Sequence, residues 1–329
     1  MGIDYIIATI IKIVIVMLVF SALAGFGTYF ERKILAFMQR RLGPMSVGPY
    51  GILQIMADGI KLFTKEDIIP TSVVGKIFKI APIITASTAF MAAATIPFWP
   101  DFTIFGYRVQ PIITDSSVGL LYVIGVMAVG LFGVLLGGMA SSNKYSLISA
   151  ARSSAVFLSY EVITGLALLA PIMLVGSLSL VNFNAYQVGG ISNWLVWKQP
   201  IAFILFWIAA FAETGRTPFH LIANDHEIID GFGTEYSGMR WGLFFIGEYA
   251  NMFFISFVIV LVFMGGFGDG SVLSALAFLG KVAFFFFFFL WTRAAWPDVR
   301  PDQLMWLCWK VLMPLAVINI VITGFVVMF

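Results

Sequence analysis

Eight apolar segments, each near the length that crosses a bilayer, account for most of this 329-residue chain. A helix needs about 20 apolar residues to span the hydrocarbon core. The segments cover residues 5–30, 78–98, 116–140, 149–177, 200–217, 239–264, 272–292 and 303–327. The chain is 60% hydrophobic and 11% charged, which is too little charge for a soluble domain of this size. The sequence therefore predicts an all-α polytopic membrane protein with eight transmembrane helices in one membrane domain, residues 1–329.

Basic residues between these segments predict their orientation. Lys and Arg gather in the odd-numbered connections, whereas the second has only Arg108, the fourth only Lys198 and the sixth none. The positive-inside rule therefore places the odd connections in the cytoplasm and both termini outside. The expected cytoplasmic loops are about residues 31–77, 141–150, 214–240 and 293–302. The leading residues carry no basic cluster, so we expect the first segment to remain as a span and not to be cleaved as a signal peptide.

A shorter amphipathic stretch, residues 51–64, lies in the first of these loops. Its apolar residues recur at helical spacing on one face, and its polar residues lie opposite. The apolar face carries Ile52, Ile55, Met56, Ile60 and Phe63, and the other face carries Gln54, Asp58, Lys61 and Lys65. The stretch is too short to span, so we expect an interfacial helix. A surface anchor and the wall of a functional site are equally compatible with this pattern.

Three carboxylates, Glu161, Glu213 and Glu248, lie inside the predicted spans. Glu161 follows Arg152 by nine residues, which corresponds to roughly 13 Å at 1.5 Å per residue. An ionised carboxylate at mid-membrane costs at least ~2.5 kcal/mol, so each of the three should face protein or water. They either hold helices together through ion pairs and hydrogen bonds or form a proton path. The lack of a matching set of basic residues at this depth favours the proton path.

Basic residues near these carboxylates are few. Arg216 follows Glu213 at the i+3 spacing of neighbouring helical side chains, which allows an ion pair between them. Lys12, Lys281 and Lys310 also lie in predicted spans, and the sequence assigns no partner to any of them.

The chain has few of the residues that hold iron–sulfur clusters or haem. Its one cysteine, Cys308, excludes an internal disulfide and a self-contained iron–sulfur cluster. Its two histidines, His220 and His226, both lie in the fifth connection, which disfavours a membrane haem held by paired histidines. Any electrons for redox chemistry must therefore arrive from another subunit.

Three long motifs carry a family resemblance. The first is Glu31-Arg32-Lys33 followed by RRLGPMSVGPYGILQIMADGIKLFTKEDIIP at 40–70. The second is AETGRTPF at 212–219 with EIIDGFGTEYSGMRWGLFFIGEY at 227–249, and the third is RAAWPDVRPDQLMWLCWKVLMPL at 293–315. Together with SYE at 159–161 they resemble the H subunit of complex I-type NADH:quinone oxidoreductases, the membrane subunit at the quinone site, over nearly the whole chain.

The resemblance implies a subunit of a proton-translocating enzyme in a bacterial inner membrane. In this family a peripheral arm with flavin and iron–sulfur clusters meets a membrane arm, and quinone is the substrate. The resemblance implies no catalytic group, bound cofactor or metal on this chain. Its expected partners are the other membrane-arm and peripheral-arm subunits, quinone and lipid, with no nucleic acid.

The resemblance also assigns residues. Those implied to border the quinone chamber or the docking loops are Glu31, Arg32, Asp58, Lys61, Arg216, Glu227, Glu235 and Arg293. Glu161, Glu213 and Glu248 are implied to form the proton pathway. In the family the quinone tunnel opens among the first span, the interfacial helix and the sixth span.

The chain departs from the family pattern in its fifth connection. The family usually reads Pro-Phe-Asp-Leu-Pro-Glu-Ala-Glu, and here two of those acids are replaced by His220 and Ala223 and a third is shortened to Asp225. Roles assigned to these acids elsewhere therefore do not carry over. The two histidines of this loop are expected to be solvated side chains.

Two alternatives remain open at this point. The first is the equivalent subunit of a related hydrogenase or of a dehydrogenase fed by ferredoxin, flavodoxin or a deazaflavin. The second, from another class, is a stand-alone ion-coupled transporter, which should show an internal repeat or a discontinuous helix. Neither feature is evident in the sequence.

Overall fold

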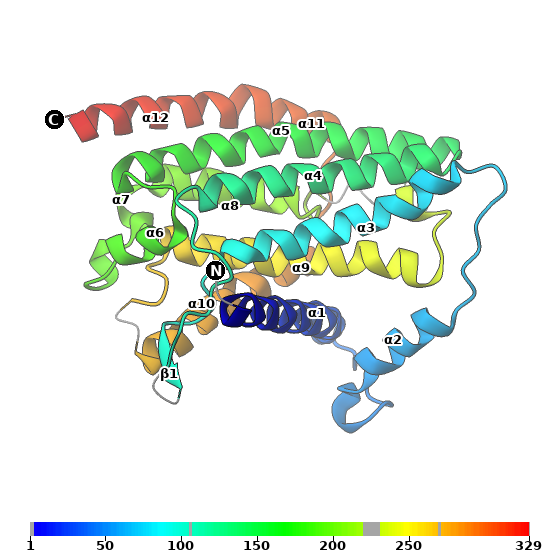
Figure 1. Cartoon of the computed structure of the whole chain (residues 1–329). Coiled ribbons are helices and arrows are strands. Elements are labelled where there is room, and N and C mark those ends of the chain that lie inside the picture. Colours follow the sequence, from blue (N-terminus) through cyan, green and yellow to red (C-terminus); the bar gives the residue numbers. More distant parts are fainter. Residues whose placement is uncertain (1–2, 105–106, 220–230, 269–270, 329) are drawn as a thin grey trace.

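Long helices running side by side form most of the computed structural model, which describes residues 3–104, 107–219, 231–268 and 271–328 (Figure 1). In these residues seven helical stretches are long and apolar enough to cross a membrane. They comprise α1 (Ile3–Met38), α3 (Gly75–Ala92) with a 3-10 turn to Thr95, α4 (Gly119–Ala140), α5 (Lys144–Val175), α9 (Gly238–Phe263), α10 (Val272–Ala295), and α11 (Pro301–Leu307) joined through a π-helical turn (Cys308–Leu312) to α12 (Met313–Met328). The predicted all-α membrane class is confirmed.

The fifth predicted span is shorter than the others. It corresponds to α8 (Pro200–Glu213), whose 14 residues extend about 21 Å at 1.5 Å per residue. This is less than the roughly 30 Å of a hydrocarbon core. Pro200 starts the helix, where its missing N–H leaves no donor unpaired, and Gly215 with φ of +62° follows its end. The count of eight spans therefore stays a prediction.

Short elements connect the spans. The predicted interfacial helix is confirmed as a helix, α2 (Gln54–Thr64), which lies outside the bundle (Figure 1). At the other end of the bundle are α6 (Leu180–Tyr186) and α7 (Leu195–Lys198). A two-stranded antiparallel sheet, β1 (Phe102–Ile104) and β2 (Tyr107–Val109), interrupts the connection between α3 and α4.

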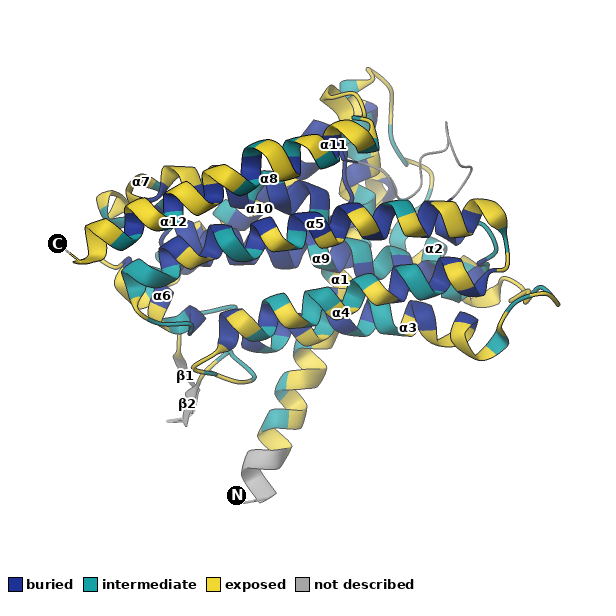
Figure 2. Cartoon of the chain, turned by 90° about the horizontal axis from the view of Figure 1, so that it is seen from above, coloured by how far each residue is buried: buried dark blue, intermediate teal, exposed yellow. Residues whose placement is uncertain are grey.

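Helix α9 is the centre of the core. Its residues from Met252 to Phe263 are all buried, and a helix that is apolar all round needs neighbours on every side. Helices α1, α3 and α10 pack against it. By contrast, residues 7–19 of α1 stand away from the bundle and are largely exposed (Figure 2). Two ionisable side chains of α9, Glu248 and Tyr249, contact side chains from outside this helix.

The lysines of the spans bind carbonyl groups or rings. The Lys12 ammonium donates to Ile112 O at 3.2 Å, and the Lys281 ammonium donates to Met264 O at 2.7 Å, one residue after α9 ends. Lys310 lies above an indole ring of its own helical stretch, 6.0 Å from the ring centroid. Lys281 thus satisfies a carbonyl that a helix end leaves without an intrahelical partner.

Glycines permit the closest helix packing in the bundle. A Cβ added to Gly138 of α4 would overlap the Cβ of Ala150 in α5 and lie 2.7 Å from Ser146 O. We expect Gly138→Ala to force these helices apart and lower the stability of the protein by about 1–3 kcal/mol, measured as a lower midpoint of thermal unfolding in detergent. Gly125→Ala, on the same helix with no atom within 4 Å, is the matched control and should leave the midpoint unchanged or raise it. Equal midpoints for the two variants would contradict the close packing of α4 on α5 as a source of stability.

Candidate functional site

A buried carboxylate, Glu31 of α1, is the centre of a charged network. Its side chain accepts hydrogen bonds at 3.0 Å from Arg216, which follows α8, and at 2.5 Å from the Tyr249 hydroxyl of α9. Arg293 near the end of α10 also donates to it. Because Glu31 is only 4% exposed, these three donors replace the water that its charge would otherwise need.

Arg216 connects Glu31 to a second carboxylate. Its Nε lies 2.9 Å from Glu248 Oε1, an ion pair, while its guanidinium carbon lies 4.6 Å from the centroid of the Tyr249 ring. Arg216 is 1% exposed, so both ion pairs form in a low-dielectric environment. With Arg293, the network has two guanidinium groups and two carboxylates and is electrically balanced.

The sequence allowed an ion pair between Arg216 and Glu213, and this prediction is wrong. Helix α8 ends at Glu213, and the chain turns at Gly215, so the i+3 geometry of a continuous helix is lost. The backbone N–H of Arg216 bonds to Phe211 O, and its side chain points to α1 and α9. Tyr249 belongs to the network although it received no role from the sequence. The one signal was its place beside Glu248 in the quoted motif.

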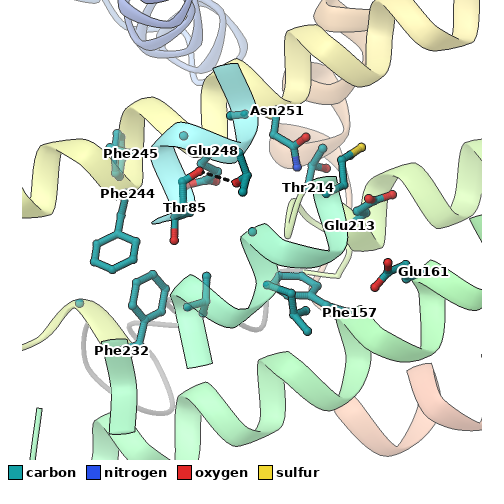
Figure 3. A pocket seen from close by; sticks show the side chains of 18 of the residues that line it. Thr85, Phe157, Glu161, Glu213, Thr214, Phe232, Phe244, Phe245, Glu248 and Asn251 are labelled. Atoms are coloured by element: carbon teal, nitrogen blue, oxygen red, sulfur yellow. Dashed lines mark hydrogen bonds between the residues drawn. The ribbon is translucent and has the colours of Figure 1, made fainter. Parts of the chain in front are cut away.

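The three predicted proton-path glutamates line one pocket of about 140 Å³ (Figure 3). Glu161 comes from α5, Glu213 from α8 and Glu248 from α9. Among the described residues, no Lys or Arg lines this pocket. The other polar lining side chains are Thr85, Thr88, Thr214, Trp241 and Asn251. The pocket therefore holds carboxylates beside groups that can donate or relay hydrogen bonds.

Two of these carboxylates share a second pocket. Glu161 and Glu213 also line a second, smaller pocket between α4, α5, α8 and α9. The Thr164 hydroxyl donates to Glu213 Oε2 at 3.4 Å. Glu248, in contrast, connects the main pocket to Arg216. The pocket and the Glu31 network are therefore continuous through one side chain.

The predicted residues of the interfacial helix form a separate ion-pair cluster. Asp58 of α2 lies 2.7 Å from Arg32 of α1 and 3.6 Å from Lys61, and it accepts a hydrogen bond from Gln54 at 3.1 Å. Partial burial opposes ionisation of Asp58, but the Gln54 hydrogen bond and the two positive charges outweigh it, so the pKa of this carboxyl lies below its usual range. Asp58 is therefore ionised at neutral pH and attaches α2 to α1.

The remaining predicted residues are dispersed or lie outside the described part of the chain. Glu235 accepts a hydrogen bond from Asn143 at 2.7 Å, which fastens the end of the fifth connection to the start of α5. Glu227, His220 and His226 lie outside the described residues. Within the described ranges no group of three or more His, Cys, Asp or Glu side chains is arranged to hold a metal ion.

These features define the class of protein. It is a polytopic α-helical membrane protein that holds a charge-balanced network of Arg and Glu side chains next to a carboxylate-lined pocket. The chain belongs to the NADH dehydrogenase family, whose sequence model matches residues 11–324.

Related proteins are similar in sequence to this chain over nearly its full length. A protein of Sulfurimonas denitrificans, named as the H subunit of NADH-quinone oxidoreductase, is 78% identical over 325 residues, 99% of each chain. Proteins with the same name from Nitratiruptor sp. and Wolinella succinogenes are 68% and 63% identical over 323 residues, 98% of each chain. The family expected from the three sequence motifs is thus confirmed.

Proposed function

We propose that this chain is the membrane subunit of a proton-translocating NADH:quinone oxidoreductase, in which it borders the quinone chamber and couples quinone reduction to proton movement. One observation carries the proposal: Arg216 binds both Glu31 on α1 and Glu248 in the three-glutamate pocket. A single cation therefore links α1, which with α2 forms the expected chamber wall, to the groups expected to carry protons.

Quinone reduction requires two electrons and two protons. The electrons would come from flavin and iron–sulfur clusters in partner subunits, because the single cysteine of this chain cannot hold an iron–sulfur cluster by itself. Its own contribution is an apolar wall from α1, α2 and α9, with Arg32, Asp58 and Lys61 at the edge. Negative charge that develops on the quinone competes with Glu31 for the nearby guanidinium groups.

This competition supplies the coupling step. When Arg216 is drawn towards new negative charge, its ion pair with Glu248 weakens, and Glu248 then takes up a proton. The proton is available to Glu213 and Glu161 because all three carboxylates line the same pocket. The cycle reverses when quinol leaves and Arg216 again binds both carboxylates.

We also propose which connections of the protein face the cytoplasm and which parts lie outside. The connections around residues 31–77, 141–150, 214–240 and 293–302 face the cytoplasm of a bacterium and dock the peripheral arm, and both termini lie outside the inner membrane. Arg293 and Glu235 lie within or beside these connections, where docking of a partner can adjust the network.

Purification in mild detergent tests the proposal. The chain should be isolated together with partner subunits that contain flavin and iron–sulfur clusters, and a photoreactive quinone should label α1, α2 or α9 of this chain. Co-purification with the components of a hydrogenase would instead assign it to the related hydrogenases. Isolation as a functional single chain would exclude the oxidoreductase and leave an ion-coupled transporter.

A further inference from the structure

The segment that follows α2 is fastened to the first turn of α9 by polar contacts. The Ser237 hydroxyl accepts a hydrogen bond from the Ile68 N–H at 3.0 Å and donates to Glu66 O at 3.3 Å. Arg240 Nη2 lies 2.9 Å from Asp67 Oδ2. Three consecutive residues, 66–68, are thus held by two side chains of one helical turn.

A glycine makes this contact close. Gly238 has φ of +56°, and a Cβ at this position would lie 3.3 Å from Lys65 O and 3.6 Å from Leu62 O. One turn later, a Cβ on Gly242 would lie 3.0 Å from Leu62 Cδ1. Two separate features therefore favour glycine at position 238: its left-handed backbone conformation and the close approach of α2.

These contacts matter because α2 has little else to hold it. No residue of α2 is buried, so packing contributes little to its position. Its other fixed point is on α1, where Arg32 pairs with Asp58 and where Gly25 lets Ile55 approach. Helix α2 is therefore suspended between α1 at one point and α9 at the other.

We propose that Asp67, Ser237, Gly238 and Arg240 form a clasp that sets the separation of α2 from α9 and thereby the width of the quinone passage between them. This inference rests on the proposed function. The four residues are positioning residues that touch no reacting atom. An ion pair as exposed as this one contributes little alone, with side chains 20% and 43% exposed for Arg240 and Asp67, and the clasp acts through its combined contacts.

The clasp predicts an effect that depends on the substrate tail. In the assembled complex, Arg240→Gln or Asp67→Asn should raise KM for a long-tailed quinone roughly fivefold, because the whole tail must fit the passage. The KM for a short-tailed analogue, and kcat for both substrates, should stay within about twofold. The charge-exchanged double variant, Asp67→Arg with Arg240→Asp, should recover most of the long-tail KM. Lys79→Gln, an exposed charge on α3, is the matched control.

Glycine variants give a second test that does not depend on charge. Gly238→Ala should raise the long-tail KM as Arg240→Gln does, whereas Gly59→Ala in α2, with no atom within 4 Å, should not. If Arg240→Gln does not assemble, the milder Ser237→Ala replaces it in the same comparison.

Each outcome supports or rejects the clasp. An unchanged long-tail KM, or an equal loss of activity with both quinones that follows the amount of assembled complex, would overturn it. Labelling of the wild-type chain by a photoreactive quinone tests the chamber separately. Labelling without a tail-dependent KM change rejects the clasp alone, whereas no labelling rejects the quinone function itself.

Discussion

Replacing Arg216 with Met is expected to remove most of the assembled complex from the membrane and to abolish quinone reduction. The change leaves Glu31 without one donor and Glu248 without its ion pair. Removing one partner from a buried ion pair costs about 3–5 kcal/mol, a large share of a typical folding free energy of about 5–15 kcal/mol. The measurement is the amount of this chain in solubilised complex, with NADH-driven quinone reduction per milligram of membrane protein.

Two companion variants separate folding from function. Arg216→Lys keeps the charge but not the planar donor array that reaches both carboxylates, so assembly should be intermediate. After Arg216→Met, Glu31 still pairs with Arg293, and Glu248 is the carboxylate left without its cation. Adding Glu248→Gln to Arg216→Met removes this uncompensated charge and should restore part of the assembly without restoring activity. Lys198→Gln, an exposed charge at the far end of the bundle, should change neither. Normal assembly of Arg216→Met would show that the network does not stabilise the protein.

The second large effect is expected for Glu213→Gln, which should leave assembly intact and lower proton translocation severely. Gln has nearly the shape of Glu and can keep the contact with Thr164, but it cannot take up and release a proton. Loss of one proton-transfer group typically lowers a rate by about 10²–10⁴, and we expect at least about a tenfold fall in proton uptake by inverted membrane vesicles during NADH oxidation. Glu161→Gln should behave alike, since both residues line the same pocket.

The control for this series is a carboxylate that lies outside the membrane-length helices. Asp101→Asn, in the connection that also contains the small sheet, removes a similar negative charge from an exposed position and should leave pumping unchanged. Full proton translocation by both Glu213→Gln and Glu161→Gln would show that the pocket does not carry protons. Lower pumping in proportion to lower assembly would lead to the same conclusion, so both quantities must be measured together.

The sequence predicted the features that depend on neighbours along the chain. Seven long helices and α2 follow from the length and periodicity of apolar residues, which are local properties. The expected depth of Glu161 followed from counting residues at a fixed rise per residue, and Glu161 lines the same pocket as Glu213 and Glu248. The local sequence pattern was therefore enough to predict these helices and to single out the glutamates that line the pocket.

The local sequence pattern was not enough to predict which side chains of distant segments pair with each other. One partner of Arg216, Glu31, is 185 positions away in the chain, and nothing in a single sequence distinguishes it from the other carboxylates as that partner. The i+3 spacing to Glu213 suggested a nearer partner, but the early end of α8 removed it. The clasp between residues 66–68 and α9 was missed for the same reason, since its contacts join segments about 170 residues apart.

The order of the residues in the buried network also governs how it is made. Glu31 belongs to the first helix, while Arg216 and Arg293 follow it by 185 and 262 positions. At roughly 5–20 residues per second on the ribosome, the last guanidinium is synthesised about 13–50 seconds after the carboxylate. Until Arg216 is made, the nascent first helix carries an acid without either of its cations, and until Arg293 is made it lacks the second. The network closes only once α10 has been made, so the proposed coupling apparatus is among the last parts of the chain to form during biogenesis.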